Sequence, residues 1–331
     1  MKRMIAVEFR RVFARDITRL LGLIVVFGSV MGGIGAFVST ASSPKTQEIE
    51  FDQTILRQRA ELPARIEKCM QGPSQTPPNI GSRVRFPQLA EPQPRPRAQC
   101  RAQLSSSGFD EADRRFHLLS FPRTLEGLMF PSAIFALIIG ATMIGAEWGA
   151  GTIPNLLTWE PRRVRVLSAK ILAVLAACAS LFLLFALFAV VTLMPALILR
   201  GTAIGLDAIW QEDMISVVLR GMYLPALSGL FGFAFAMMIR NTAAALGAAF
   251  GYLLIAENLI RATGALHAWL VSSNAAVVGV GFSPFRSFSG EEPVSLALAE
   301  RSSLEAGVIL GAYVLLITLI SGFLFHRRDV H

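Results

Sequence analysis

Four cations gather in one short segment of this sequence, between two long apolar runs. They are Arg162, Arg163, Arg165 and Lys170, and they end the stretch that begins at Glu147. Cations that flank apolar runs stay in water, so this stretch is predicted to be a loop at a membrane face. Such a loop can bind a partner through its charges. Alternatively, the interfacial Trp148 and the basic cluster only hold it on the cytoplasmic side.

The sequence lacks the motifs of common catalytic and metal-binding sites. It contains no Walker A motif for phosphate and no G-x-S-x-G nucleophile elbow. The four histidines, at 117, 267, 326 and 331, have no metal-ligand spacing such as H-E-x-x-H. We therefore expect no catalytic residue, no metal site and no cofactor in this chain. An integral-membrane enzyme remains an alternative interpretation.

Glu257 is the ionisable residue that falls within a predicted membrane span. A carboxylate at that depth is costly, which makes it a candidate for a functional group. Its neighbours Asn258 and Arg261 favour a second interpretation, in which Glu257 is a paired group near the outer membrane interface. The residue type alone leaves both interpretations open.

Composition indicates a membrane protein. The 331 residues are 53% hydrophobic and 16% charged, with a mean hydropathy of +0.53. The net charge of +8 comes from short loops and one long polar insert rather than from a basic face interleaved with aromatic residues. Nucleic-acid binding is therefore not expected. The basic run over residues 1–19 is long, and no clear cleavage site follows the first apolar run, so we expect no cleavable signal.

Long apolar runs predict an all-α integral membrane protein with six transmembrane helices. The helices are expected at residues 20–44, 125–146, 166–199, 219–239, 241–260 and 305–325, joined by a cytoplasmic loop at 147–165 and an outer loop at 200–218. With the N-terminus inside, the cytoplasmic segments carry thirteen cations and the short outer segments five. This bias places both termini, including the tail at 326–331, in the cytoplasm.

Two segments have more than one interpretation. Residues 1–19 approximate an apolar helical stripe with cations elsewhere, which is typical of an amphipathic elbow helix on the inner surface, or they are a basic leader that only sets topology. Within the outer segment 261–304, residues 265–282 are uncharged and apolar but rich in small and polar residues. We interpret them as a re-entrant outer hairpin, and a seventh span is the alternative.

The polar segment 45–124 is predicted to be an extracellular insert between the first two spans. We expect a helix over 46–70, interrupted near Pro63, then an extended proline-rich stretch over 73–96, and a new helix over 107–120. Cys69 and Cys100 bracket the proline-rich stretch on the oxidising side, so a disulfide is expected, with two free thiols as the alternative. Cys178 lies inside a span and is expected to be a packing residue.

The stretch from Glu147 to Lys170 has the pattern E-W-x-x-G-T-x-x-x-L-L-T-x-x-P-R-R-x-x-x-L-x-x-K. The residues that carry it are Glu147, Trp148, Gly151, Thr152, Leu156, Leu157, Thr158, Pro161, Arg162, Arg163, Leu167 and Lys170. This pattern resembles the first cytoplasmic loop of ABC-2 type permeases, the membrane subunits of ATP-driven exporters. The resemblance implies that the residues from Glu147 to Arg163 couple this chain to an ATPase. It also favours the elbow helix and the re-entrant hairpin.

The resemblance further implies partners and a substrate class. It implies two cytosolic ABC ATPase subunits that hold ATP and Mg, a second permease copy or a paralogue, surrounding membrane lipid, and a bacterial plasma membrane. Opposed subunits would meet along the second and fifth spans around a substrate cavity, to which we assign Phe130, Phe135, Met143, Phe250, Tyr252 and Glu257. Such a lining suits export of a hydrophobic or amphipathic drug, antibiotic or lipid-like molecule. In the alternative, the chain moves its insert to regulate an envelope partner without transport.

Overall fold

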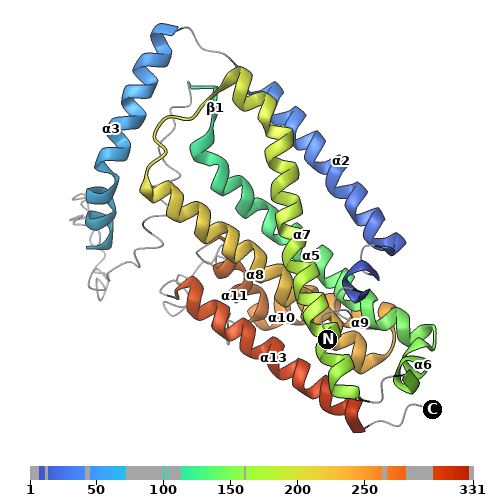
Figure 1. The fold of residues 1–331 in the computed structure, drawn as a ribbon. Coiled ribbons are helices and arrows are strands. Elements are labelled where there is room, and N and C mark those ends of the chain that lie inside the picture. Colours follow the sequence, from blue (N-terminus) through green and yellow to red (C-terminus); the bar gives the residue numbers. More distant parts are fainter. Residues whose placement is uncertain are drawn as a thin grey trace.

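The computed structural model describes residues 7–11, 14–41, 45–71, 100, 104, 113–159, 162–262, 267–280 and 301–327. Within these residues, six helical segments are long and apolar enough to cross a membrane. They are α2 (Asp16–Ser39), α5 (Phe121–Gly149), α7 (Arg163–Arg200), α8 (Ala208–Ile239), the composite α9 (Thr242–Gly251), η2 (Tyr252–Ala256) and α10 (Glu257–Ala262), and α13 (Ser303–Arg327) (Figure 1). The chain is therefore a mostly helical multi-pass membrane protein, as predicted.

The helices extend beyond the apolar runs that predict them. The clearest case is α8, which begins at Ala208, inside the stretch expected to be an outer loop. Asp207 caps this helix, since its side chain accepts a hydrogen bond of 2.9 Å from the backbone of Trp210. The first turns of α8 carry polar residues such as Gln211 and Asp213, so hydropathy alone does not detect them.

The core of the bundle is the crossing of α5 and α8, which approach closely at glycines. A Cβ atom at Gly140 would overlap the backbone carbonyl of Gly229, and one at Gly232 would overlap the carbonyl of Leu137. Small residues let two backbones come this close in a membrane. Cys178 of α7 packs buried against Gly229, which agrees with the predicted packing role of this cysteine.

The fifth span is interrupted by a π-helical turn, η2, between α9 and α10. After it, residues 263–266 lie outside the described residues, and the chain continues as η3 (His267–Trp269) and α11 (Val271–Val280). The ten residues of α11 extend about 15 Å, which is half the hydrocarbon thickness. In the described residues α11 is thus no seventh span. The predicted re-entrant hairpin includes residues outside the described ones and remains a prediction.

The insert begins with α3 (Lys45–Met70), which lies at the end of the molecule opposite to helix α6 (Figure 1). The helix runs through Pro63 without a break, so the interruption predicted there is wrong. A disulfide joins Cys69 to Cys100, as predicted, and covers a small cluster of Leu62 and Ile66. The proline-rich stretch over 73–96 lies outside the described residues.

The helix predicted over 107–120 is wrong in its described part. Phe116 and His117 form the short strand β1, which pairs in parallel with β2 (Gly201–Thr202), and η1 (Leu118–Ser120) leads into α5. The pairing with β2 is a tertiary contact that no local helical signal reveals. The start of the predicted helix, at residues 107–112, lies outside the described residues.

Ion pairs attach α3 to the start of α8 and to the segment before β1. Arg59 lies 2.7 Å from Asp207, the cap of α8, and Arg115 lies 2.8 Å from Asp52 of α3. Arg115 also pairs with Asp113. Burial disfavours the charge on Asp113, but hydrogen bonds from Arg115 outweigh it and hold the pKa of Asp113 below its ordinary value. The carboxylate therefore stays ionised and keeps Arg115 in place.

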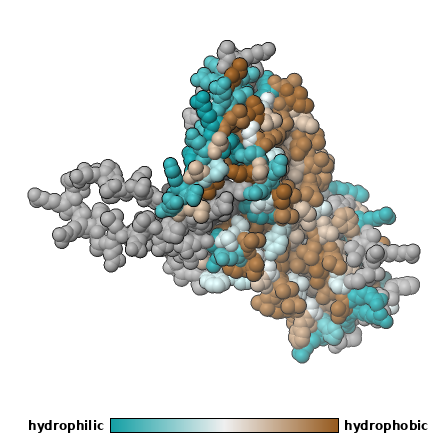
Figure 2. All heavy atoms as spheres, turned by 60° about the vertical axis from the view of Figure 1, so that its left-hand side comes forward, coloured by the Kyte–Doolittle hydropathy of each residue, from teal (hydrophilic) through white to brown (hydrophobic). Residues whose placement is uncertain are grey.

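The surface follows the expected membrane pattern. Figure 2 shows hydrophobic side chains along the side of the bundle, with hydrophilic residues concentrated at the upper part and at the lower edge. Large exposed apolar side chains occur on α2, α7, α10 and α13, for example Phe27, Leu187, Leu259 and Leu316. Exposure of these large apolar side chains to water is unfavourable, so lipid or another apolar partner must cover them.

Candidate functional site

The segment predicted to couple to an ATPase forms a turn and a short helix. Helix α5 ends at Gly149, and α6 (Thr152–Trp159) begins three residues later. Gly151 has a φ of +64°, a conformation that glycine adopts without strain, so the glycine in the family pattern has a backbone role. The Thr152 hydroxyl donates to the carbonyl of Glu147 at 3.2 Å and holds the turn against the end of α5.

One side of α6 is buried and the other is exposed. Ile153 is 2% exposed and belongs to the main hydrophobic core. Asn155 and Thr158 are exposed, and Leu156 is half-buried. The helix therefore rests on the bundle through Ile153 and presents a small polar face to its surroundings.

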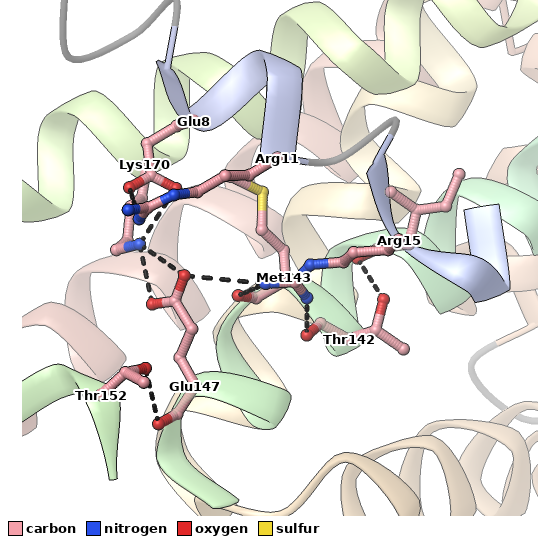
Figure 3. Close-up of polar contacts among 9 residues, drawn as sticks. Glu8, Arg11, Arg15, Thr142, Met143, Glu147, Thr152 and Lys170 are labelled. Carbon is pink, nitrogen blue, oxygen red and sulfur yellow. Dashed lines mark hydrogen bonds and ion pairs between the residues drawn. The ribbon is translucent and has the colours of Figure 1, made fainter. Parts of the chain in front are cut away.

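Lys170 lies at the centre of a buried ion-pair cluster. Its Nζ lies 2.8 and 2.9 Å from the two carboxylate oxygens of Glu147 and 3.2 Å from Glu8, as Figure 3 shows. The residue exposures of Lys170 and Glu8 are only 2% and 3%. Buried charges need such partners, since an unpaired charge away from water is unfavourable by several kcal/mol or more. The cluster thus joins α5 and α7 to the N-terminal segment.

Arg15 completes the charge balance of this cluster. It lies 3.7 Å from Glu147, and its guanidinium donates to the backbone carbonyls of Thr142 and Met143 in α5 (Figure 3). Arg11 pairs with Glu8 at 3.1 Å. Residues 7–11 are helical and Phe9 packs against the main core, whereas an amphipathic elbow helix over 1–19 remains a prediction. The N-terminal segment is therefore bound to the base of the α5–α6 turn.

Trp148 and Arg163 connect the same turn to two more spans. The Arg240 guanidinium, at the end of α8, stacks 4.4 Å from the Trp148 ring, and Phe325 of α13 meets that ring edge-on. Arg163 donates to the carbonyls of Phe325 at 3.2 Å and His326 at 3.1 Å, at the end of α13. The α5–α6 turn and the start of α7 thus contact the ends of α8 and α13.

The structure brings together only part of the predicted coupling segment. Glu147, Trp148, Thr152 and Arg163 lie in the contacts above, whereas Arg162 is exposed. Pro161 lies outside the described residues, as does the side chain of Leu157. Sequence reasoning missed Glu8 and Arg15 as members of the cluster. The signal that could have indicated Glu8 is that it is the only acidic residue among the first fifteen.

The six residues assigned to a substrate cavity occupy different environments. Phe130 is 38% exposed, Phe135 packs edge-on against Phe185, and Phe250 is half-buried beside the core. Met143 and Glu257 are enclosed, at 1% and 0% exposure, and Tyr252 lies in η2. Phe130 and Met143 are about 20 Å apart along α5, so the set does not form one cluster within a single chain.

No group of three metal-ligating side chains occurs among the residues that the structure describes. The contacts described at the α6 end are ion pairs, hydrogen bonds and a cation–π contact. These interactions can hold the α5–α6 turn in place and can carry a displacement of the turn to the helices that it contacts.

Comparison with known proteins agrees with this architecture. A protein-family model described as "ABC-2 family transporter protein" matches residues 4–273, which include the N-terminal segment, the α5–α6 turn and the first five spans. No curated protein and no solved structure matches the chain. The family match covers most of the sequence and contains the residues that carried the initial resemblance. The chain therefore belongs to the ABC-2 family of transporter proteins, as a permease of the ABC-2 type.

Proposed function

We propose that this chain is the transmembrane subunit of an ATP-driven exporter and that α6 with its flanking turns contacts a separate ATPase subunit. The observation that carries the proposal is the anchoring of the α5–α6 turn by Glu147 and Lys170, while Asn155 and Thr158 of α6 remain exposed. A docking element needs this combination of a rigid base and a free face. ABC-2 permeases generally work with ABC ATPase partners, which supports the same proposal.

The contacts of the turn provide a route for force. Displacement of α6 acts on α5 directly, on α7 through Lys170 and on the N-terminal segment through Glu8 and Arg15. It acts on α8 through the stacking of Trp148 with Arg240. A push on one short helix thus reaches most of the bundle through short, charge-assisted contacts. Such contacts are stiff compared with apolar packing against lipid.

The remaining elements of the proposal follow the charge distribution. The α6 end carries the basic residues of the N-terminal segment and of 162–170, so it faces the cytoplasm of a bacterial plasma membrane, with both termini inside. The Cys69–Cys100 disulfide at the other end fits an oxidising exterior. Two cytosolic ATPase subunits bind ATP and Mg, and a second permease copy or paralogue completes the transport unit.

The substrate proposed is hydrophobic or amphipathic, such as a drug, an antibiotic or a lipid-like molecule. The second and fifth spans expose apolar side chains in the single chain, among them Phe130, Ile134, Leu254 and Ile255. These faces are available to a second copy and to an apolar molecule between the copies. A sugar or an ion would require several convergent polar groups instead.

Transport can be tested in inverted membrane vesicles that contain this permease and its ATPase. We expect ATP-dependent uptake of at least one compound from a panel of lipophilic dyes, antibiotics and fluorescent phospholipids. Uptake should be absent with a non-hydrolysable ATP analogue and with an ATPase variant that cannot hydrolyse ATP. ATP hydrolysis by the assembled complex without uptake of any compound would instead favour a subunit that moves its insert without transport.

The aromatic residue Phe135 provides a test of the substrate path. Replacing Phe135 by Ala is expected to change the uptake ratio of a large to a small apolar dye by roughly tenfold, because one apolar contact contributes 1–3 kcal/mol to discrimination. Phe185→Ala is the matched control, since it removes the other ring of the same pair from the enclosed side of α7. Equal changes in the two variants would assign Phe135 to core packing rather than to the path.

A further inference from the structure

Helix α11 is held in an orientation that its neighbours define. It packs against α13, α8 and α5. The carbonyl of Trp269, just before α11, accepts a hydrogen bond of 3.1 Å from Tyr313, whereas the carbonyl of Val277, near its end, accepts from Ser303 at 3.2 Å. Ser303 is the first residue of α13 and Tyr313 lies ten residues further along it. The N-terminus of α11 therefore lies nearer the middle of the α13 span, and in this sense deeper in the membrane, than its C-terminus.

Glu257 binds the deeper end of α11. Its carboxylate accepts hydrogen bonds from the backbone N–H groups of Val271 at 2.9 Å and Ser272 at 3.0 Å, the first two residues of the helix. Glu257 itself is 0% exposed. The N-terminus of a helix carries a partial positive charge and unpaired N–H groups, so it suits a buried carboxylate. These contacts explain how Glu257 is accommodated inside the membrane region.

Arg220 binds the opposite end of α11. Its guanidinium donates to the carbonyl of Val278 at 3.1 Å and pairs with Glu126 of α5 at 3.2 Å. The C-terminus of a helix carries a partial negative charge, which suits a cation. Glu257 and Arg220 come from different spans and meet the two ends of α11 with the matching signs of charge. This correspondence indicates an element clamped by its dipole rather than one packed by apolar contacts alone.

Two further polar contacts lie between the ends. Asn274 is fully enclosed, accepts from Arg301 at 2.9 Å and donates to the carbonyl of Leu270 at 2.8 Å. Arg261 of α10 donates to the Ser272 hydroxyl at 2.6 Å. The contacts of Asn274 with Arg301 and of Ser272 with Arg261 tie this half of α11 to the residues just before α13 and to α10.

The fifth span depends on this attachment more than the other central spans do. Only 17% of its most apolar part is buried in the chain, against 61% for α8. Leu254, Ile255 and Leu259 point away from the bundle, with exposures of 66% or more. The π-helical turn at Tyr252–Ala256 separates its two halves, so the second half, α10, is not fixed by a continuous α-helix.

We infer that Glu257 and Arg220 are positioning residues that clamp α11 by its two ends and that Glu257 thereby fixes the second half of the fifth span. The inference goes beyond the proposed function and does not depend on which molecule is transported. Glu257, which the sequence offered as a cavity residue, acts here on another helix of the same chain. Helix α11 and its contacts lie toward the end of the spans that is opposite to α6.

Hydrogen–deuterium exchange of the full permease–ATPase complex tests the clamp. In Glu257→Ala, we expect amides in residues 267–280 to exchange at least tenfold faster, while amides of α5 keep their protection. Glu257→Gln keeps one acceptor oxygen without the charge and should give an intermediate increase in the exchange rate. If the alanine variant does not assemble, the exchange rate of the glutamine variant tests the clamp instead. Asp16→Asn is the matched control, because it removes a carboxylate whose side chain is 98% exposed.

Arg220 allows a test by conservative rescue. Arg220→Met should increase exchange in α11, and Arg220→Lys should restore most of the protection, because it returns the positive charge to the helix C-terminus. Co-purification of the ATPase should stay normal in all these variants, since α6 lies at the other end. Unchanged exchange of α11 in the Glu257 variants, or equal loosening of α5 and α8, would overturn the inference. Absence of transport in the wild type would bear on the proposed function alone.

Discussion

Replacing Lys170 by Ala is expected to abolish ATP-dependent transport and to weaken ATPase co-purification strongly. The variant leaves the carboxylates of Glu8 and Glu147 buried without their central cation. Removing one partner of a buried ion pair destabilises by about 3–5 kcal/mol. The base of the α5–α6 turn should therefore open, and α6 should lose its fixed position. Co-purification and the thermal midpoint of the detergent-solubilised protein measure the two effects.

Two further variants separate stability from coupling. Arg19→Ala is the matched control, since it removes an exposed cation from the same end of the molecule, and it should leave both measurements unchanged. Combining Lys170→Met with Glu8→Gln and Glu147→Gln removes these three buried charges together and leaves Arg15 its bonds to the carbonyls of α5, which should recover part of the stability. Normal ATPase association and transport in Lys170→Ala would reject the anchored turn as the coupling element.

Gly140→Leu is expected to prevent assembly of the bundle. A side chain at this position would overlap the carbonyl of Gly229 and separate α5 from α8, the helices at the core. Overpacking a well-packed core usually costs about 1–3 kcal/mol, and more where the obstacle is backbone that cannot move aside. We expect folded protein to fall below detection in size-exclusion chromatography of solubilised membranes.

Gly127 provides the control on the same helix. A Cβ atom there meets nothing within 4 Å, so Gly127→Leu should assemble like the wild type. A rescue variant probes the neighbouring contact: Gly229→Ala would overlap the sulfur of Cys178, and Cys178→Ala should relieve part of that overlap. If Gly140→Leu and Gly127→Leu assembled equally well, the close approach of α5 and α8 would be wrong.

Features with a strong local signal could be predicted from the sequence. Six spans follow from apolar length, and the disulfide follows from the positions of Cys69 and Cys100 on one side of the membrane. The α5–α6 turn was located by its pattern, in which Gly151 has a backbone reason to be glycine. These inferences depend on the properties of a few consecutive residues, or on counts of apolar residues in a run and of cations in the loops.

Features that depend on distant residues could not be predicted. The first turns of α8 are polar, and the cap at Asp207 with its ion pair to Arg59 helps to explain why they are helical. Likewise, β1 exists because Phe116 meets Gly201. Glu257 had two open interpretations, and its partners at the start of α11 show no periodic relation to it in the sequence. Pairings of this kind are decided by the tertiary fold.

The cluster at Lys170 also constrains the order in which the protein can assemble. Glu8 is synthesised first, and Lys170, the buried cation that joins it to Glu147, follows only after two complete spans, α2 and α5, have been made. Until α7 begins to enter the membrane, neither Glu8 nor Glu147 has Lys170 as a partner. The N-terminal segment can contact α5 earlier through Arg15, but its attachment through Lys170 cannot form during insertion of the first two spans. The attachment through Lys170 is thus a late step, because it requires the third span to be in place.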